Sequence, residues 1–520
     1  MYVTQGLKRA AQCNRNGTST LCDDRLHTWS ETLERVQRLA GGLRRLGVQS
    51  EERVAILSLN NDRYLELYYA IPWAAGIVVP LNFRLSPSEI AYTLQDSGST
   101  ILCVDKNLWP VAKALIPQLR QIKHTLFLGH SDEAPEGLIA LEDLIEDNSP
   151  IPDACRGFDD IFGLFYTGGT TGKAKGVMLT HNNICSNALP VIGNMHYGPH
   201  TRYLHAAPMF HAADCGSTFG ITQSAGAHLF LEKFHPETLL KQLQDDKISA
   251  VMLVPTMLNM MVNHPNFEDF DLSSLTDIIY GASPMPEPLI RTLLQAMPHT
   301  RFTQCLGMTE MSPVITCLYP HQHKLEGPDS KRLRSVGQAA FNVEVRIVDE
   351  ADQDLPPNQI GQILCRGTPM MKGYWNQPDQ TSKALKDGWL HTGDAGYMDE
   401  DGFIYVVDRV KDMIITGGEN VYSTEVESCL LSHKGVKDCA VIGLPHDVWG
   451  EVVTAIVVPH EGSSLTEELL VTHCRSHIAH YKCPSVVIFR DVPLPLSGAA
   501  KVLKMQLRAE YSDSNCSITR

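Results

Sequence analysis

Short apolar runs alternate with stretches of helical periodicity along most of this chain, and this alternation limits the possible folds more than any other feature. Helix-favouring segments such as residues 236–245 and 286–296 separate the runs. The runs in the middle of the chain lie at residues 202–206, 227–231, 250–254, 277–280 and 301–305. Buried parallel strands read as continuous apolar runs and need a crossover helix between them. The pattern therefore predicts an α/β fold, with a large region of several subdomains built from layered βα sheets.

The periodicity near the N-terminus predicts a long helix, and the texture of the chain changes beyond about residue 340. Residues 28–49 carry apolar side chains at helical spacing, with Ser30 as the expected N-cap and Gly47 as the expected stop. Past residue 340, short strands such as 343–348 alternate with turns, and the tail mixes strands with a helix at 467–479. We therefore expect a smaller α+β domain at the C-terminal end.

The composition excludes several classes of protein. The chain has 520 residues, of which 43% are hydrophobic and 20% charged, and its formal charge is −15. Phosphate-backbone binding needs a basic surface, so nucleic acid is not an expected partner. The 14 cysteines show no C-x-x-C spacing, which is typical of free thiols in a reducing compartment. The N-terminus has no apolar targeting core, and the longest uncharged apolar stretch, residues 67–81, is too short to span a bilayer. These features predict a cytoplasmic protein without a transmembrane segment.

The densest chemical signal is a glycine-rich loop at residues 164–177, LFYTGGTTGKAKGV. An apolar strand runs into a loop with four glycines, three threonines and two lysines. Glycines let main-chain N–H groups converge on one point, and the hydroxyl and ammonium groups add donors, which is typical of a phosphate cradle. It is not a Walker A loop, because only three residues separate Gly168 from Gly172 and Ala174 follows Lys173 where Ser or Thr would be needed.

Further motifs follow the loop in order, and the whole set resembles the adenylate-forming superfamily of acyl- and aryl-CoA synthetases, adenylation domains and luciferases. The resemblance covers roughly residues 25–510. The further motifs are PMFH at 208–211, YGASPM at 280–285, LGMTE at 306–310, GWLHTGD at 388–394, DRVKD at 408–412, GGEN at 417–420 and PLSGAAK at 495–501.

The resemblance implies an ATP-dependent acyl-CoA ligase of the AMP-forming type. In such enzymes a carboxylic acid reacts with ATP to give an acyl-AMP and pyrophosphate, and coenzyme A then displaces AMP. The implied substrates and cofactors are a small-molecule carboxylic acid, ATP, Mg²⁺ and coenzyme A. Gly168 and Ala174 are loop variants that resemble those of fatty-acyl-CoA ligases, which favours a medium- or long-chain fatty acid.

Three alternatives stay open beside the fatty-acyl-CoA ligase. An adenylating enzyme that passes its acyl group to a carrier protein and an aryl-CoA ligase share the same motifs. A non-catalytic ligand-binding relative is disfavoured, because the expected active-site residues occur together: Thr171, Glu310, Asp394, Arg409 and Lys501. Peripheral contact with a membrane and assembly into a homodimer are also left open.

The resemblance assigns the nucleotide-binding residues motif by motif. Lys175 matches the loop lysine, Thr309 an α-phosphate ligand and Glu310 the magnesium ligand. Asp394 matches the carboxylate that holds the ribose hydroxyls, and Arg409 a ribose- or phosphate-side contact. The phosphate cradle consists of Thr167, Gly168, Gly169, Thr170, Thr171 and Gly172. The walls of the nucleotide and acyl pockets consist of Gly281, Ala282, Ser283, Leu306, Gly307 and Met308, with Leu306 in place of the more frequent aromatic residue.

The C-terminal motifs imply a mobile domain. Lys501 matches the lysine that catalyses adenylation, because an ammonium group between the carboxylate and the α-phosphate offsets both charges. Lys411 matches the hinge about which the C-terminal domain rotates between two catalytic poses. The expected organisation is therefore an adenylation domain at residues 1–409, a hinge at 410–411 and a mobile domain at 412–520.

The motifs expected to bind coenzyme A and the acyl group are less distinctive than those for the nucleotide. Gly417 and Gly418 match the loop that lines a pantetheine tunnel, and His211 resembles the gate between that tunnel and the acyl pocket. Trp449 matches an aromatic residue near coenzyme A in some aryl-CoA ligases. The pocket candidates carry no second charge, which favours an apolar acid, and we interpret Asp214 as a structural polar group.

Overall fold

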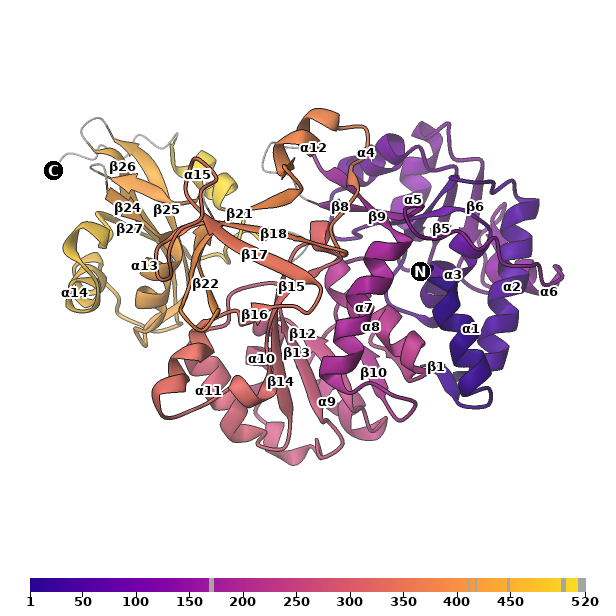
Figure 1. Cartoon of the computed structure of the whole chain (residues 1–520), viewed down its shortest axis with the longest axis horizontal. Coiled ribbons are helices and arrows are strands. Elements are labelled where there is room, and N and C mark those ends of the chain that lie inside the picture. Colours follow the sequence, from indigo (N-terminus) through magenta and orange to yellow (C-terminus); the bar gives the residue numbers. More distant parts are fainter. Residues whose placement is uncertain (168–172, 410–411, 417–418, 447–448, 497–501, 513–520) are drawn as a thin grey trace. The chain divides into compact units, whose positions relative to one another are not determined.

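The computed structural model describes residues 1–167, 173–409, 412–416, 419–446, 449–496 and 502–512. The chain forms two compact units (Figure 1). Unit 1 comprises Met1–Val345 and Cys365–Leu390, and unit 2 comprises Arg346–Leu364 and His391–Arg520. The predicted hinge at residues 410–411 lies outside the described residues, so the domain boundary there stays a prediction.

The first sheet of unit 1, sheet I, has the strand order β19-β9-β8-β4-β3-β5-β6-β7. Its core strands β4, β3, β5 and β6 are parallel, whereas β8 and β9 form an antiparallel hairpin. The strands are β3 (Arg53–Leu57), β4 (Ile77–Pro80), β5 (Ile101–Val104), β6 (His124–Phe127), β7 (Ile139–Ala140), β8 (Ile161–Thr167), β9 (Lys175–Thr180) and β19 (Gly373–Tyr374).

The second sheet of unit 1, sheet II, has the order β16-β15-β14-β13-β12-β10-β11-β1-β2. Strands β10 to β14 are parallel to one another, which confirms the predicted βα alternation. The strands are β1 (Thr18–Cys22), β2 (Arg25–Thr28), β10 (Arg202–His205), β11 (Ala227–Phe230), β12 (Ala250–Leu253), β13 (Asp277–Gly281), β14 (Arg301–Gly307), β15 (Val314–Leu318) and β16 (Gln338–Ala339).

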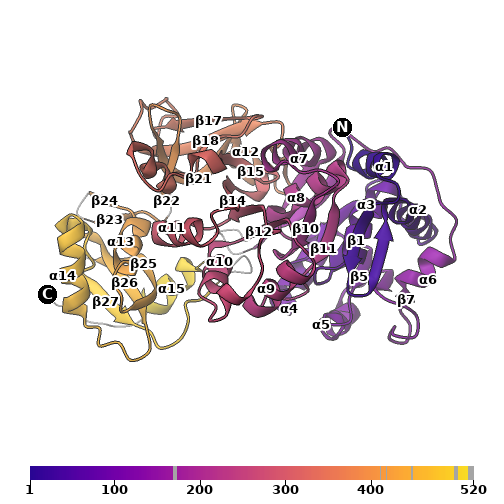
Figure 2. The ribbon, with the colours of Figure 1, turned by 90° about the horizontal axis from the view of Figure 1, so that it is seen from below.

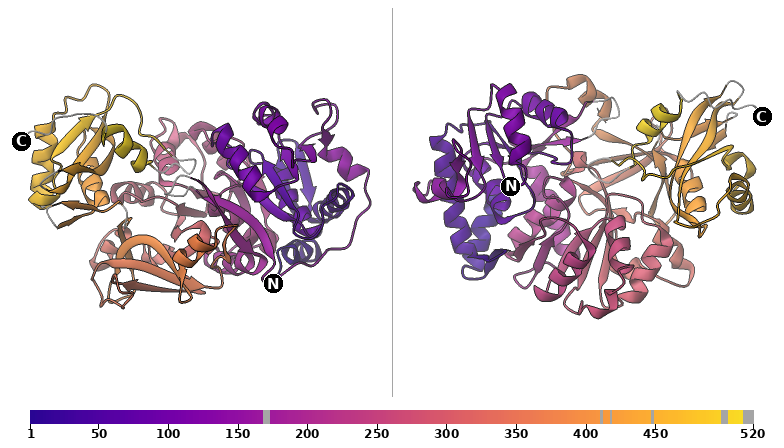
Figure 3. Two further views of the ribbon diagram at one scale, coloured as in Figure 1. Left: turned by 90° about the horizontal axis from the view of Figure 1, so that it is seen from above. Right: turned by 180° about the vertical axis from the view of Figure 1, so that it is seen from behind.

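Helices cover both faces of both sheets, as the two views in Figure 3 show for the indigo and violet strands of sheet I. On β3, Val54 and Ile56 join a central core, whereas Ala55 and Leu57 join an outer core. The central core also includes Ile279 of β13, so this core lies between sheet I and sheet II. The helices of unit 1 are α1 (Thr4–Cys13), α2 (Trp29–Arg45), α3 (Asp62–Trp73), α4 (Pro87–Ser97), α5 (Trp109–Leu115), α6 (Leu141–Glu146), α7 (His181–Met195), α8 (Ala212–Ser224), α9 (Pro236–Asp245), α10 (Pro255–Val262), α11 (Glu287–Ala296) and α12 (Pro378–Ala384).

The N-terminal helix pair shows one correction to the sequence analysis. Helix α2 lies beside α1 (Figure 2) and begins at Trp29, with Thr28 rather than Ser30 as its N-cap. The Thr28 hydroxyl accepts from the Glu31 N–H at 3.3 Å, and the Glu31 carboxylate accepts from the Thr28 N–H at 2.7 Å. This reciprocal capping box satisfies two main-chain donors, which Ser30 inside the first turn would not do.

Unit 2 contains the tail that the sequence predicts to be α+β. Its sheet has the order β24-β23-β26-β25, with β27 beside β26. Helices α13 and α14 pack on one face, and α15 packs on the other. The elements are β23 (Ile414–Thr416), β24 (Glu419–Val421), β25 (Val436–His446), β26 (Gly450–Pro459), β27 (Val486–Phe489), α13 (Ser423–Leu431), α14 (Glu467–His477) and α15 (Lys504–Ser512).

The strands before this tail form a further sheet with the order β17-β18-β21-β20, and β22 pairs with β21. They are β17 (Val343–Val348), β18 (Gly361–Gly367), β20 (Leu385–Lys386), β21 (Trp389–Met398) and β22 (Ile404–Arg409). The predicted fold class, layered βα sheets plus a smaller α+β part, is confirmed. Within the described part of the chain, every helix falls short of the length and apolar character that crossing a bilayer requires.

Candidate active site

Three of the sequence motifs lie at the carboxyl edge of sheet II. Strands β14, β13, β12 and β10 are neighbours in that order and run parallel. The segment 208–211 follows β10, Ala282 and Ser283 follow β13, and the segment 308–310 follows β14. The carboxyl ends of parallel strands are the usual place for ligands in α/β sheets. The topology therefore gathers motifs that are up to about 100 residues apart in the chain.

Two glycines of these motifs are required by close main-chain packing. A Cβ atom at Gly281 would lie 2.1 Å from the carbonyl oxygen of Cys305 on the neighbouring strand. A Cβ atom at Gly307 would lie 2.4 Å from the carbonyl oxygen of Pro313. Both contacts are shorter than van der Waals separation, so only glycine fits. At Gly281 and Gly307, both predicted as pocket walls, the main chain therefore packs so closely that a side chain has no room.

The base of the glycine-rich loop is a hairpin in sheet I. Thr167 at the end of β8 pairs with Lys175 at the start of β9. The predicted cradle residues Gly168, Gly169, Thr170, Thr171 and Gly172 lie outside the described residues. The described part shows that the strand predicted before the loop exists and that Lys175 begins the returning strand.

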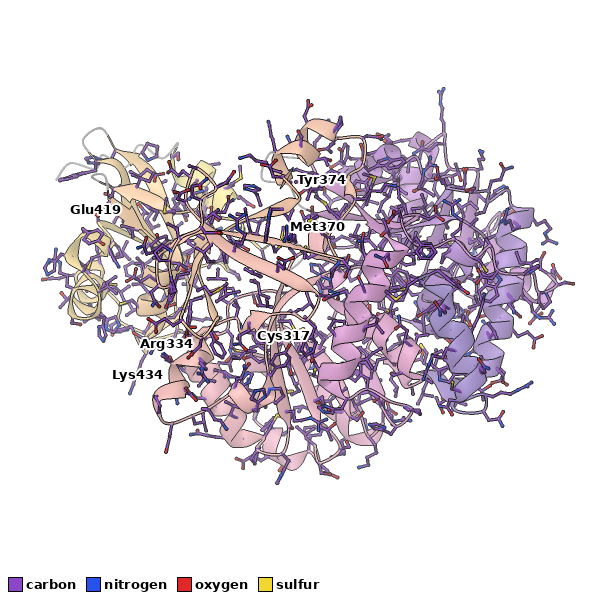
Figure 4. The ribbon with its side chains drawn as sticks, viewed as in Figure 1. Cys317, Arg334, Met370, Tyr374, Glu419 and Lys434 are labelled. Atoms are coloured by element: carbon purple, nitrogen blue, oxygen red, sulfur yellow. The ribbon has the colours of Figure 1, made fainter. Side chains whose placement is uncertain are left out.

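Tyr374 brings the loop lysine and the predicted magnesium ligand together. It lies on β19, directly beside Val177 of β9 (Tyr374 is labelled in Figure 4). The Nζ atom of Lys175 lies 4.7 Å from the centroid of the Tyr374 ring, and the Tyr374 hydroxyl donates to Oε1 of Glu310 at 2.8 Å. An ammonium over an aromatic face is attracted by the ring. The ring thus contacts a cation on its face and a carboxylate at its hydroxyl.

The surroundings of Tyr374 keep its hydroxyl protonated. Burial and the neighbouring Glu310 carboxylate raise the pKa of Tyr374 well above its usual value. A neutral phenol is the form that donates to a carboxylate. Tyr374 was not among the residues predicted from the sequence motifs. Its only signal is the turn-like Gly373-Tyr374-Trp375-Asn376 run, which carries no information about a partner at position 310.

Glu310 is held by main chain as well as by Tyr374. It lies in the short 3₁₀ turn η3 (Thr309–Met311), and its carbonyl oxygen accepts from the Met371 N–H at 2.8 Å. The residue is 7% exposed. Oε2 receives no hydrogen bond from any residue that the structure describes. A fixed carboxylate with one engaged and one available oxygen is chemically suited to a hard cation such as Mg²⁺.

Asn60 fixes the loop between β10 and α8, a role that no sequence motif indicates. Asn60 follows β3 of sheet I, and its amide nitrogen donates to the carbonyl oxygens of His205 at 2.8 Å and Ala207 at 2.9 Å. Its amide oxygen accepts from the Met209 N–H at 2.8 Å. The hydroxyl of Tyr68 donates to the Met209 carbonyl at 2.6 Å. Sheet I therefore positions the segment that presents Phe210 and His211.

His211 forms the N-cap of α8. Its Nδ1 accepts from the Ala213 N–H at 3.1 Å, so the proton of the neutral ring is on Nε2. The ring lies edge-on to Phe210, at 6.4 Å between centroids, and Phe210 in turn meets Phe83 at 5.2 Å. The half-buried histidine is therefore backed by an aromatic pair, while its predicted gating role stays a prediction.

The pocket walls differ in how far they are covered. Ala282, Ser283, Leu306, Met308 and Thr309 are half-buried. Ala282 and Met308 pack against the central core. The neighbouring Met311 and Val314 are buried in that core. The apolar lining predicted for the acyl pocket is thus present at these strand ends.

Asp214 belongs to a buried hydrogen-bonded chain of unit 1. Its carboxylate accepts from the Tyr203 hydroxyl at 2.9 Å and contacts Nδ1 of His205 at 2.6 Å. Nε2 of His205 lies 2.9 Å from Nδ1 of His228, and Nε2 of His228 lies 3.0 Å from the Thr222 hydroxyl. All are buried. The structure supports the interpretation of Asp214 as a structural polar group, because its carboxylate is used inside the core.

In unit 2, the two predicted ribose-side residues are cross-strand partners. Asp394 of β21 pairs with Arg409 of β22, and Asp394 is 8% exposed. Trp449 is exposed, at 55%. The predicted catalytic Lys501, the hinge residue Lys411 and the tunnel glycines Gly417 and Gly418 lie outside the described residues, and the roles of all these residues stay predictions.

A second group with metal-binding chemistry lies in unit 2. One ligand atom each of Cys429, His473 and His477 lies within 4.8 Å of the others. Nε2 of His473 lies 3.1 Å from the carbonyl oxygen of Cys429, and Nδ1 of His477 lies 2.8 Å from the carbonyl oxygen of His473. Carbonyl oxygens only accept hydrogen bonds, so these two ring nitrogens carry protons and already donate to the main chain.

Comparison with known proteins agrees with this arrangement. A family model described as AMP-binding enzyme matches residues 7–375, and one described as AMP-binding enzyme C-terminal domain matches residues 425–501. The chain belongs to the AMP-binding enzyme family. The resemblance to the adenylate-forming superfamily stated from the motifs is thereby confirmed.

Similar proteins of this family span the whole chain. A feruloyl-CoA synthase from Amycolatopsis sp is 37% identical over 97% of this chain and 98% of its own length. A medium/long-chain-fatty-acid–CoA ligase from Mycobacterium tuberculosis is 34% identical over 94% of this chain and 86% of its own length. The ATP-bound crystal structure of MatB from Rhodopseudomonas palustris is 30% identical, covers 99% of both chains and superposes with a TM-score of 0.88.

Proposed function

We propose that this protein is an AMP-forming ligase that activates an apolar carboxylic acid with ATP and transfers the acyl group to coenzyme A. The observation that carries the proposal is the Lys175–Tyr374–Glu310 arrangement. It brings a residue of the phosphate-loop motif and the acidic residue of a later motif to one tyrosine, in a chain of the AMP-binding enzyme family.

The first half-reaction joins two anions, so charge neutralisation and positioning dominate it. A carboxylate oxygen attacks the α-phosphorus of ATP, the bond to the β-phosphate oxygen breaks, and pyrophosphate leaves with that electron pair. Lys175 and the Thr167–Gly172 cradle would bind the β- and γ-phosphates. Thr309 would donate to the α-phosphate, and Lys501 would offset charge between carboxylate and phosphate.

Glu310 would hold Mg²⁺, which when bound neutralises part of the phosphate charge. The chain's own contribution is to fix the carboxylate. The Tyr374 hydroxyl engages Oε1 of Glu310, and the Met371 N–H holds its carbonyl oxygen. Asp394 would accept from the ribose hydroxyls, with Arg409 as its cross-strand neighbour.

In the second half-reaction the coenzyme A thiol loses its proton and attacks the acyl carbon, and AMP leaves. Gly417 and Gly418 would line the pantetheine path, Trp449 would contact coenzyme A, and His211 would gate the acyl pocket. Rotation about Lys411 would exchange the two poses of the C-terminal domain, residues 412–520.

The acid is apolar, and its class is the finer part of the proposal. Ala282 and Met308 offer an uncharged wall. The loop variants Gly168 and Ala174 favour a medium- or long-chain fatty acid. A fatty-acid–CoA ligase and a feruloyl-CoA synthase are both similar along nearly the whole chain. The aryl acid therefore stands beside the fatty acid as a second candidate, and transfer to a carrier protein stays the alternative acceptor.

The test is an assay of pyrophosphate release with a panel of acids. Octanoate, palmitate, ferulate, 4-coumarate and benzoate are each supplied with ATP and Mg²⁺, with and without coenzyme A, and the products are identified by mass. We expect turnover that needs coenzyme A and yields an acyl-CoA with one class of acid. Glu310→Gln should abolish it, because an amide replaces the anionic ligand. Turnover indifferent to coenzyme A, or none with any acid, would overturn the proposal.

A further inference from the structure

Two cysteines face each other across the strand pair that carries the LGMTE motif. Cys305 of β14 and Cys317 of β15 are direct partners in the antiparallel register, and their Sγ atoms lie 3.6 Å apart. Residues opposite each other in such a pair have Cα atoms about 4.5–5.5 Å apart, inside the range that a disulfide bridges. Closing the bond requires the sulfurs to approach to about 2.05 Å, a shift of about 1.5 Å.

The pair lies directly beside the candidate active site. Cys305 precedes Leu306 and is half-buried, and it packs against the same central core as Ala282 and Met308. Cys317 (labelled in Figure 4) is 3% exposed. Because Cys305 is the more exposed of the two thiols, a small oxidant would meet it first, with Cys317 behind it as the thiol that completes the bond.

We propose that Cys305 and Cys317 form a peroxide-sensitive thiol pair whose reversible cross-strand disulfide slows the enzyme. This control of turnover rests on the proposed function, whereas the disulfide itself does not. The chemistry needs only hydrogen peroxide as oxidant and a thiol as the later reductant.

The oxidation balances in two steps. The Cys305 sulfur attacks one oxygen of hydrogen peroxide, the O–O bond breaks, and water leaves, so that Cys305 becomes a sulfenic acid. The Cys317 thiol then loses its proton, and its sulfur attacks the Cys305 sulfur. The S–O bond breaks and a second water leaves. Two thiols are oxidised to one disulfide, and one peroxide is reduced to two waters.

The structure explains why this disulfide would slow the reaction at the candidate active site. Strand β14 leads straight into Thr309 and Glu310, and the register shifts between Leu306 and Gly307. The Met308 N–H donates to the Pro313 carbonyl at 2.9 Å, and a Cβ atom at Gly307 would lie 2.4 Å from the same oxygen. Closing the sulfurs would therefore displace a tightly packed turn between the two strands. A displacement of about 1 Å at a reacting site costs up to roughly 100-fold in rate.

Peptide mapping of the full-length protein tests the bond without any substrate. Trypsin leaves Cys305 and Cys317 in a single peptide, residues 302–324, and Glu-C protease cuts this peptide after Glu310. After peroxide treatment and alkylation, we expect the two halves to stay joined, lighter by two hydrogen atoms, and to separate on reduction with dithiothreitol. In Cys317→Ser, dimedone should label Cys305 and no joined peptide should form.

The effect on turnover is measured before and after peroxide in each protein. The turnover of wild type should fall by about tenfold or more after peroxide and recover with dithiothreitol. The turnover of Cys305→Ser should fall by less than about twofold after peroxide. Cys103→Ser, a matched control in which a buried thiol of β5 is removed, should respond like wild type.

Two results overturn the proposal: separate peptide halves in oxidised wild type, or joined halves with unchanged turnover. If the reduced protein turns over no acid in the panel, the proposed function has failed, and the peptide map still decides whether the thiol pair exists.

Discussion

At the scale of single residues, Tyr374 is the side chain on which the proposed mechanism depends most among those that the structure describes. Its ring lies under the Lys175 ammonium, and its hydroxyl holds Glu310. Neither contact can be deduced from the sequence, because the three residues are far apart in the chain. The pairing of β19 with β9 brings Tyr374 to Lys175, and the turn η3 presents Glu310 to the Tyr374 hydroxyl.

Tyr374→Phe removes the hydroxyl and leaves the ring under Lys175. A hydrogen bond to a charged group contributes about 1.5–3 kcal/mol, which corresponds to a loss of about ten- to 100-fold in acyl-AMP formation. As a positioning residue, Tyr374 should also affect the Mg²⁺ dependence, so a magnesium titration of pyrophosphate release should show a higher half-saturating concentration.

Tyr166→Phe is the matched control for that variant. Its hydroxyl donates to Asp96 at 2.7 Å from the same sheet and has no contact with Glu310. It should keep the wild-type magnesium dependence. An identical shift in both variants would show that a buried tyrosine hydroxyl matters for stability alone.

Lys501→Ala separates the two half-reactions. We expect acyl-AMP formation to fall by roughly 100-fold or more, because a charge-neutralising group is lost from the transition state. Thioester formation from supplied acyl-AMP should be spared, since its leaving group is already formed. Rapid-quench assays of the two steps measure this, and equal losses in both would contradict the two-pose model.

At the scale of elements, the capping of α2 shows how far local patterns can be trusted. The periodicity placed the helix correctly, but the cap is Thr28 and not Ser30. Both residues can cap a helix. What decided between them is Glu31, which stands three residues after Thr28 and completes a reciprocal box.

Thr28→Ala should lower the free energy of unfolding by about 1 kcal/mol, whereas Ser30→Ala should lower it by less than about 0.5 kcal/mol. Urea titrations followed by circular dichroism compare the two variants directly. A larger loss for Ser30→Ala would show that the box does not stabilise the start of α2.

At the scale of the whole molecule, buried histidines couple stability to pH. His181 accepts from the Val3 N–H at 3.2 Å, and Nδ1 of His323 lies 2.9 Å from the Tyr319 carbonyl oxygen. Burial lowers the pKa of each to about 4. Below pH 6.5 the unfolded chain binds a proton at each histidine and the folded chain does not, so the free energy of unfolding falls as the pH falls from about 6.5 towards 4.

Each of these histidines lowers the free energy of unfolding by about 2 kcal/mol between pH 7 and pH 5. His181→Phe keeps an aromatic ring against Phe162, which His181 meets edge-on at 5.7 Å, and removes the titrating group. Urea midpoints at the two pH values should therefore differ less in this variant than in wild type. An unchanged difference would show that His181 does not contribute to acid destabilisation.

The layered α/β class, most strand and helix positions, and the strand ends at which a site should form can all be predicted from the order of residues alone. These features are encoded locally, because apolar runs, helical periodicity and glycine-rich turns are properties of neighbouring residues. The match of the motifs to the AMP-binding enzyme family rests on the same local signals in order.

Which distant residues meet became known from the three-dimensional arrangement of the sheets and helices. Strand order placed Tyr374 between Lys175 and Glu310, placed Asn60 against the loop before α8, and set Cys305 opposite Cys317. The physical reason is that periodicity specifies which face of an element is buried, but not which element covers it. That choice depends on how complete sheets and helices pack together over the whole chain.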